Sequence, residues 1–482
     1  MTRKLILNTS QPFGMWVIAV VGMLFSIGTT TIMTSFGDYL LSTRDPIETL
    51  LNIDFMVSSN IFLFSAAGVI GGFLGFTIGH KRSVALGILY ACAGLVLLAT
   101  HNLEIIGFSV YVVGIGASVP NLFTTLSFLY TQDDPRRHGG FVVVYMGIVF
   151  GSVLAIIGVD FLLFSMGYRS FFVLITLLNL VAVLVFISSN AYLNRNTSMS
   201  ENVVPRYIWS TASVVFILII VSALIHYLLQ HPIWLQWIVL VIGVAALISM
   251  LYCGLSEHDS AQRKLNVTLM ILMIFSGFFW FADKNILIAF LSEIKFFGNS
   301  TSFFALVSLS GDFIFEINLV IILAVITVLA VFWNKHKHQQ SIGRFARFFG
   351  FGLLISAGAC LVLCLSFLIN LFHDVSVATN SLVMIAVLLN AIAKVVFLPL
   401  YYALVGKLAP RKYEAILMGY FFLMTAVFGV LAMWLNDYTV NAFQRQHYAP
   451  GYLYSGLFFI LAIMAMVAYL YAKFCDKHSK NL

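Results

Sequence analysis

The stretch from Gly114 to Ser152 decides the fold, and it reads GIGASVPNLFTTLSFLYTQDDPRRHGGFVVVYMGIVFGS. Two apolar runs flank a short polar loop, which holds every acidic and basic residue of the stretch. A helix needs about 20 apolar residues to span the hydrocarbon core of a bilayer. Extended outward, the two runs cover residues 105–130 and 140–167. The stretch therefore predicts two membrane-spanning helices joined by a polar turn.

The same pattern recurs along the whole chain. Its 482 residues are 61% hydrophobic and 9% charged, whereas soluble domains carry about 25% charged residues. This composition excludes a soluble fold, and the sequence lacks the alternating ten-residue segments of a β-barrel. It predicts an all-α integral membrane protein. Fourteen spans are expected, at approximately 12–37, 53–79, 83–100, 105–130, 140–167, 170–191, 207–229, 232–254, 266–291, 313–334, 346–371, 378–406, 413–436 and 450–473.

The basic residues set the predicted orientation. With fourteen spans, twenty of the 26 Lys and Arg residues fall on the side of the two termini. The opposite side receives only Arg44, Arg169, Lys295 and Arg445. Because basic residues collect in cytoplasmic loops, we expect a multi-pass protein of the inner (cytoplasmic) membrane with both termini in the cytoplasm. The net charge of +7 has the same origin and is no sign of nucleic-acid binding.

Enzymatic chemistry has no sequence signal here. The five cysteines lie in or beside apolar runs, without a zinc-ligand spacing or a disulfide framework. We find no pattern of a nucleophile with its base and no cofactor motif. The expectation is a protein that is not an enzyme, with no metal and no cofactor.

Charged residues inside the spans are the candidates for function. The segment FWFADKNILIAF, residues 279–290, places Asp283 and Lys284 in an apolar run, and Glu316 and Lys394 lie in two later spans. A charge at the bilayer centre costs about 2.5–3.5 kcal/mol on insertion scales, so such residues face a wet cavity or a partner. Two interpretations stay open: a solute site, or a structural ion pair such as Glu316 with Lys394.

The opening stretch resembles the proton-dependent oligopeptide transporter (POT) family of the major facilitator superfamily. That family has a pattern close to G-x-G-x-x-K-P-N, then D-x-R-R-D-x-G-F, then F-Y-M-G-I-N-L-G. The matching residues are Gly114, Gly116, Pro120, Asn121, Asp134, Arg136, Arg137, Gly140, Phe141, Tyr145, Met146, Gly147 and Gly151. The segment KLAPRKYEAILMGYFFL, residues 407–423, is similar to the family's K-L-A-P-x-R…M-G-x-W-F-L stretch.

The resemblance implies a fold of two six-helix bundles with a two-helix insert. It divides the chain into an N-terminal bundle (1–192), an insert with its linkers (193–264) and a C-terminal bundle (265–482). It also implies a site between the bundles and import of di- or tripeptides driven by protons. Loops such as the one around Asp134, Arg136 and Arg137 can latch a closed state of these transporters, which makes the three residues gating candidates; a topology anchor is the alternative.

Most of the family's charged machinery is replaced in this chain. Gly22, Phe25 and Ser26 stand where the family has Glu, Glu and Arg. The Lys of helix four is Val119, the acid of the loop between helices two and three is Phe76, and the Glu residues of helices seven and ten are Lys284 and Lys394. If protons are coupled, Glu316 or Asp283 must carry them.

The solute site is therefore predicted from spacing and resemblance together. Asn390 and Lys394 are four residues apart and share a helix face. The predicted solute-binding residues are Lys284, Glu316, Lys394, Asn318, Asn390, Trp280, Asn121 and Tyr145. Two lysines and one acid favour a solute that bears a carboxylate. Peptides qualify, and the alternatives are an organic anion or amino acid, moved inward or outward, and a sensor that transports nothing.

Overall fold

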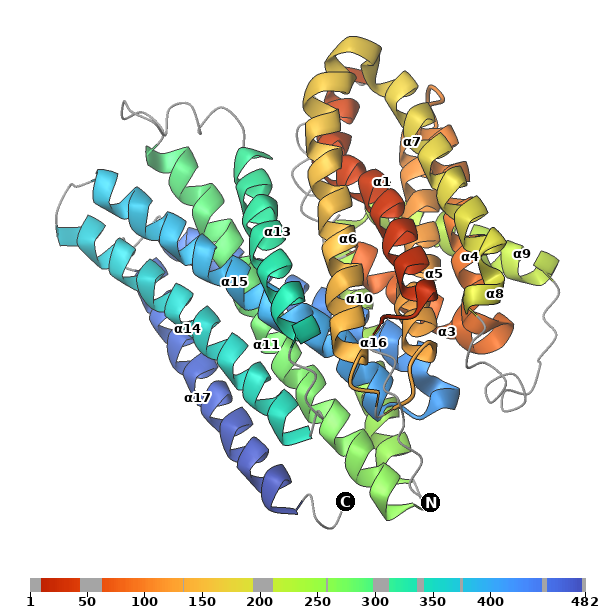
Figure 1. Ribbon diagram of the computed structural model, residues 1–482. Coiled ribbons are helices and arrows are strands. Elements are labelled where there is room, and N and C mark those ends of the chain that lie inside the picture. Colours follow the sequence, from red (N-terminus) through yellow and green to blue (C-terminus); the bar gives the residue numbers. More distant parts are fainter. Residues whose placement is uncertain are drawn as a thin grey trace, which may run out of the picture.

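A computed structural model of the chain describes residues 10–43, 63–132, 134–193, 211–256, 259–297, 312–335, 342–372, 376–443 and 449–478. Every regular element in these ranges is helical (Figure 1). The first half contains α1 (Phe13–Thr43), α3 (Gly68–Leu74), η1 (Gly75–Gly79), α4 (His80–Leu98), α5 (Glu104–Phe128), α6 (Arg137–Gly158), η2 (Val159–Leu163), α7 (Phe164–Ser188) and α8 (Asn190–Leu193). The second half contains α9 (Thr211–Leu229), α10 (Pro232–Leu255), α11 (Ser260–Phe297), α13 (Asp312–Lys335), α14 (Ile342–Phe372), α15 (Ser376–Leu408), η4 (Arg411–Tyr413), α16 (Glu414–Phe443) and α17 (Ala449–His478).

The helices have the length and composition of membrane spans. Within the described residues, twelve helical stretches are long and apolar enough to cross a bilayer, which confirms the prediction of an all-helical membrane protein. One of the twelve, Leu63–Leu98, contains 36 residues. It is interrupted at Gly79, whose positive φ of 91° is a conformation that glycine adopts without steric cost. A shorter apolar helix covers Asn318–Val331.

The long helices form two bundles. In the N-terminal bundle α4 packs on α5 and α1 on α6, and in the C-terminal bundle α14 packs on both α15 and α17. The N-terminal bundle consists of α1 and α3–α7, and the C-terminal bundle of α11 and α13–α17. Their helices converge at the end where α1 begins and α17 ends, and they diverge toward the other end (Figure 1).

Aromatic rings fill the region where the bundles meet. Phe123 of α5 stacks on Tyr402 of α15 with 4.0 Å between ring centroids, and Phe76 of η1 stacks on Tyr413 of η4 at 5.8 Å. His138, at the start of α6, lies edge-on to Phe345 of α14 at 6.0 Å. These contacts join the bundles without charge pairs.

The two helices between the bundles divide their contacts. The α9 helix packs on α5, and its Ser222 hydroxyl lies 2.9 Å from the Tyr90 hydroxyl of α4. The α10 helix packs on α16 and α11 instead, and Gln236 accepts a hydrogen bond of 2.5 Å from the Trp434 indole. Each insert helix is therefore attached to a different bundle.

Close approach of α3 and α5 depends on glycine. A Cβ added at Gly71 would overlap the carbonyl oxygen of Gly116, so Gly71→Ala should push the two helices apart. Forcing extra methyl groups into packed regions costs about 1–3 kcal/mol, and we expect a clearly lower midpoint of thermal unfolding in detergent. Gly358→Ala is the control, because a Cβ at Gly358 of α14 would meet open space. Equal midpoints for the two variants would contradict this packing.

Candidate functional site

A buried carboxylate lies at the contact between α11 and α15. Asp283 of α11 is 0% exposed. Its Oδ1 atom is 2.7 Å from the ammonium of Lys394 and accepts a hydrogen bond of 2.6 Å from the Asn390 side-chain amide. Asn390 and Lys394 reach the same oxygen because they are one turn apart on α15. Asp283, Lys284, Asn390 and Lys394 are called the Asp283 cluster below.

Lys284 is the second cation of this cluster. Its Nζ atom is 4.0 Å from Oδ2 of Asp283, beyond hydrogen-bonding distance. The ammonium lies over the ring of Trp280, 5.5 Å from the ring centroid, in the range of a cation–π contact. Trp280 and Lys284 are four residues apart, so one face of α11 carries both. The side chains of Lys284 and Lys394 are 15% and 14% exposed.

The cluster faces the N-terminal bundle. Ala391 and Val395, which flank Lys394 on α15, belong to the same packed cluster as Val142 and Val149 of α6. Tyr145 of α6 lies within electrostatic reach of Asp283. Lys394 is 18 residues after the start of α15 at Ser376 and 14 residues before its end at Leu408. At a rise of about 1.5 Å per residue it is about 20 Å from either end, which is deep within a membrane span.

The other predicted solute-binding residues have different surroundings. The Asn121 amide donates hydrogen bonds to the carbonyls of Gly71 (2.7 Å) and Ala117 (2.9 Å) and to the Ser83 hydroxyl (2.9 Å). Asn121 therefore ties α3, α4 and α5 together, and none of these contacts reaches the Asp283 cluster. Asn318 of α13 is buried. Glu316 also lies in α13, but its side chain is outside the described part of the structure.

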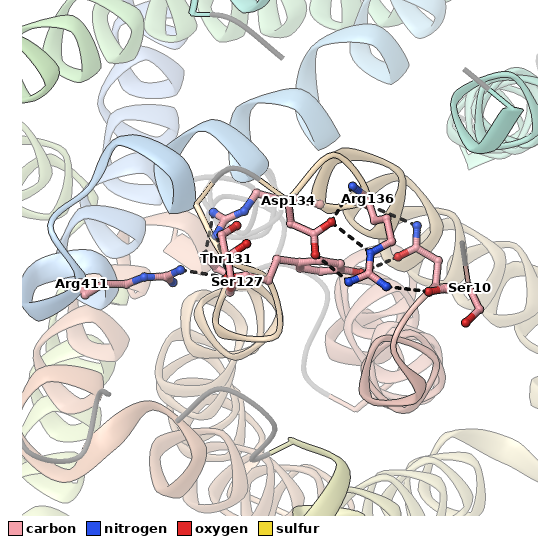
Figure 2. Close-up of polar contacts among 9 residues, drawn as sticks. Ser10, Ser127, Thr131, Asp134, Arg136 and Arg411 are labelled. Atoms are coloured by element: carbon pink, nitrogen blue, oxygen red, sulfur yellow. Dashed lines mark hydrogen bonds and ion pairs between the residues drawn. The ribbon is translucent and has the colours of Figure 1, made fainter. Parts of the chain in front are cut away.

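The three predicted gating residues lie around the loop between α5 and α6 (Figure 2). Asp134 and Arg136 form an ion pair of 2.8 Å, and Arg136 also donates to the carbonyl of Ser10 at 2.9 Å. Burial raises the pKa of Asp134, but the hydrogen bonds from Arg136 outweigh it and leave this pKa below its usual value. The hydrogen bond to Asp134 raises the pKa of Arg136. Both partners belong to the N-terminal bundle, so the pair shapes the loop.

Arg137 supports the same loop from inside. Its guanidinium is buried and donates to the Ser127 hydroxyl at 3.2 Å and to the carbonyls of Ser127 and Tyr130 at 3.3 and 3.2 Å. It also attracts the carboxylate of Glu414, which begins α16 in the other bundle. Arg137 thus holds the chain turn at the end of α5 and presents a positive charge to the C-terminal bundle.

Arg411 connects the bundles directly. From η4 it donates a hydrogen bond of 2.9 Å to the carbonyl of Tyr130, across to the other bundle (Figure 2). Its second nitrogen donates to Glu414 at 3.1 Å, and its guanidinium lies 4.8 Å from the centroid of the Phe128 ring. Phe128, Tyr130, Arg137, Arg411 and Glu414 are called the Arg411 cluster below.

Sequence reasoning did not single out Arg411 or Glu414 as functional residues. Both lie in the KLAPRKYE segment, and their spacing of three residues was the available signal, since it places an acid and a base on neighbouring turns. The contact of Arg411 to a backbone carbonyl has no sequence signature. A second absence concerns metals: within the described residues no group of three or more His, Cys, Asp or Glu could hold a metal ion.

Comparisons with known proteins place this geometry in a wider set. The family model described as the POT family matches residues 58–450. A dipeptide and tripeptide permease A of Serratia proteamaculans is 24% identical over 418 residues, covering 82% of this chain and 79% of that protein. A permease with the same name from Chromobacterium violaceum is 26% identical over 396 residues, covering 80% of this chain and 77% of that protein.

Solved structures share the fold. A POT family transporter in complex with 5-aminolevulinic acid superposes with a TM-score of 0.66 at 17% identity, covering 96% of each chain. A mutant of the peptide transporter POT in complex with alafosfalin gives a TM-score of 0.64 at 20% identity, covering 95% of each chain. The arrangement of helices is therefore the one seen in these transporters.

Proposed function

The chain belongs to the POT family, and from this premise we propose that it is a secondary active transporter driven by protons. It imports di- or tripeptides, or similar small solutes bearing a carboxylate, across the inner membrane. The observation that carries the proposal is the Asp283 cluster, in which an acid and two lysines lie deep in the membrane on the face of one bundle that meets the other. Charges in such a position mark substrate or ion pathways.

The proposal includes the finer organisation of the chain. We propose fourteen spans, because Leu63–Leu98 is interrupted at Gly79 and counts as two, and because Asn318–Val331 lies within the longer helix α13. The bundles then correspond to residues 1–192 and 265–482, with an insert at 193–264. The packing of α9 and α10 on the outside of different bundles supports this division.

Gating follows from the proposed orientation. If both termini lie in the cytoplasm, the end where the bundles converge (Figure 1) is cytoplasmic. The Arg411 cluster then closes the cytoplasmic side, and the solute enters from outside. Asp134 and Arg136 fix the loop whose Tyr130 carbonyl Arg411 binds, and Arg137 holds that loop from within. Rocking of one bundle on the other around a central site completes transport.

Asp283 is the proposed proton carrier among the described residues. Its position between Lys394 and Lys284 means that protonation would release both ammonium groups, so proton binding and solute binding act on the same charges. Glu316 is the alternative carrier in the same proposal.

Uptake of labelled dipeptide into proteoliposomes tests the proposal. We expect accumulation when an inward proton gradient is imposed, and a loss of at least about tenfold in initial rate when it is abolished, which corresponds to about 1.4 kcal/mol. Asp283→Asn should retain counterflow of unlabelled against labelled peptide but lose accumulation, because exchange needs no net proton movement. Lys264→Gln, a change near the other end of α11, is the control. Gradient-independent accumulation by the wild type would remove proton coupling, and lack of any peptide flux would remove peptide transport.

A further inference from the structure

We infer that Lys284 is an anion subsite in the C-terminal bundle, and that the Asp283 cluster selects solutes with net negative charge over zwitterions. This inference rests on the proposed function and narrows its substrate class. The chemistry that fits is a small carboxylate whose amino group is absent or blocked, such as an N-acylated dipeptide.

The first step is the pairing of Asp283. Its Oδ1 atom has both Lys394 at 2.7 Å and the Asn390 amide at 2.6 Å, and the carboxylate is wholly buried. A buried carboxylate in such contact is neutralised by its partner and is not available to a second cation. Asp283 can therefore not serve as the anchor for the ammonium group of a peptide while Lys394 stays in place.

The second step is the charge that remains. The cluster contains two ammonium groups and one carboxylate, which leaves one positive charge. Lys284 carries it, because its Nζ atom is 4.0 Å from Oδ2 of Asp283 and makes a cation–π contact with Trp280. Three N–H donors on an ammonium group need acceptors, and a carboxylate supplies them with the missing charge. The partial exposure of Lys284 leaves room for that approach.

The third step concerns the opposite bundle. At the first-helix positions where the family carries charge, this chain has Gly22, Phe25 and Ser26. Phe25 is buried, and the Ser26 hydroxyl already donates to carbonyl oxygens, including that of Ile148 on α6 at 2.8 Å. Tyr145, the α6 residue near Asp283, is neutral. The described residues of the N-terminal bundle that face the cluster thus supply neither a competing cation nor an acid for an amine.

A charge series of one dipeptide tests the inference. N-acetyl-Ala-Ala is an anion, Ala-Ala a zwitterion and Ala-Ala-amide a cation, and their size is nearly the same. Equilibrium binding to the purified full-length protein should follow that order, with the acetylated form about tenfold or more tighter than the amide, the size of one charged hydrogen bond. Tightest binding of the zwitterion or the amide would overturn the inference.

Variants separate the subsite from general effects. Lys284→Gln should remove the preference for the acetylated dipeptide, whereas Lys284→Arg should keep it and Lys264→Gln on the same helix should not change it. A Lys284→Gln protein that keeps the wild-type preference, with the wild-type elution profile in gel filtration, would overturn the inference. Glu316→Gln tests whether that acid already neutralises Lys284; a tenfold gain in affinity for the acetylated form would also overturn it.

The outcomes also separate this inference from the proposed function. Proton-driven transport of Ala-Ala with rejection of its acetylated form would leave the proposed function standing and remove the subsite. Binding and flux of the acetylated form without peptide flux would keep the subsite and remove peptide transport. Failure of all three dipeptides to bind would remove both.

Discussion

Lys394→Met should be the most damaging single substitution in the membrane interior. It removes the nearest cation from the Asp283 carboxylate, which is 0% exposed and 2.7 Å from the lysine, and it leaves the Asn390 amide as the remaining close partner. Removing one partner of a buried ion pair costs about 3–5 kcal/mol. We expect a sharp fall in folded yield and in the midpoint of thermal unfolding in detergent.

The matched control removes the whole pair. In Asp283→Leu with Lys394→Met no buried charge is left unpaired, and apolar residues of similar volume replace buried ion pairs at little cost in stability. This double variant should unfold at nearly the wild-type temperature but should not accumulate peptide. Wild-type stability of the Lys394→Met single variant would contradict the contact between Lys394 and Asp283.

Arg411→Ala should shift the balance between the two ends of the transporter. The substitution removes the hydrogen bond to the Tyr130 carbonyl, the contact over Phe128 and the partner of Glu414, a carboxylate that is 0% exposed. Hydrogen bonds to charged groups contribute about 1.5–3 kcal/mol. If their loss falls on the state in which the bundles meet, that state should become about 10- to 100-fold less populated.

Cysteine accessibility measures this shift. A single cysteine at Ser127, which lies beside Arg137 under the joined bundles, should react with a membrane-impermeant maleimide much faster in the Arg411→Ala background, when the reagent is on the side of the termini. Arg136→Ala is the control, because its ion pair with Asp134 and its contact to Ser10 stay within one bundle. An equal change in both variants would show that loop loosening, and not release of the C-terminal bundle, exposes the site.

Much of the fold could be predicted because apolar runs specify helices directly. The predicted spans 105–130, 232–254 and 313–334 agree with Glu104–Phe128, Pro232–Leu255 and Asp312–Lys335 to within about two residues. The 36-residue stretch around Gly79 was also predicted as two spans, at 53–79 and 83–100. Hydropathy is enough for these boundaries, since lipid requires every backbone group to be paired within its own helix.

The site was harder to predict, because apolar composition does not fix the rotation of a helix about its axis. Glu316 was weighed as the structural partner of Lys394, and Asp283 was treated mainly as a neighbour of Lys284. The structure instead pairs Lys394 with Asp283, while the side chain of Glu316 lies outside its described residues. Which of two adjacent charged residues on α11 faces α15 depends on interhelical packing, and a single sequence does not reveal that.

The split attachment of α9 and α10 limits how far the protein can move. Because α9 is fastened to α5 and α10 to α16, any swing of one bundle against the other must pull on the short turn at Gln230 and His231 that joins them. That turn is already closed by hydrogen bonds from both of these backbone amides, to Tyr227 and Leu228. The hairpin therefore works as a strap across the seam, and its stiffness sets the stroke of the transport cycle from the lipid side.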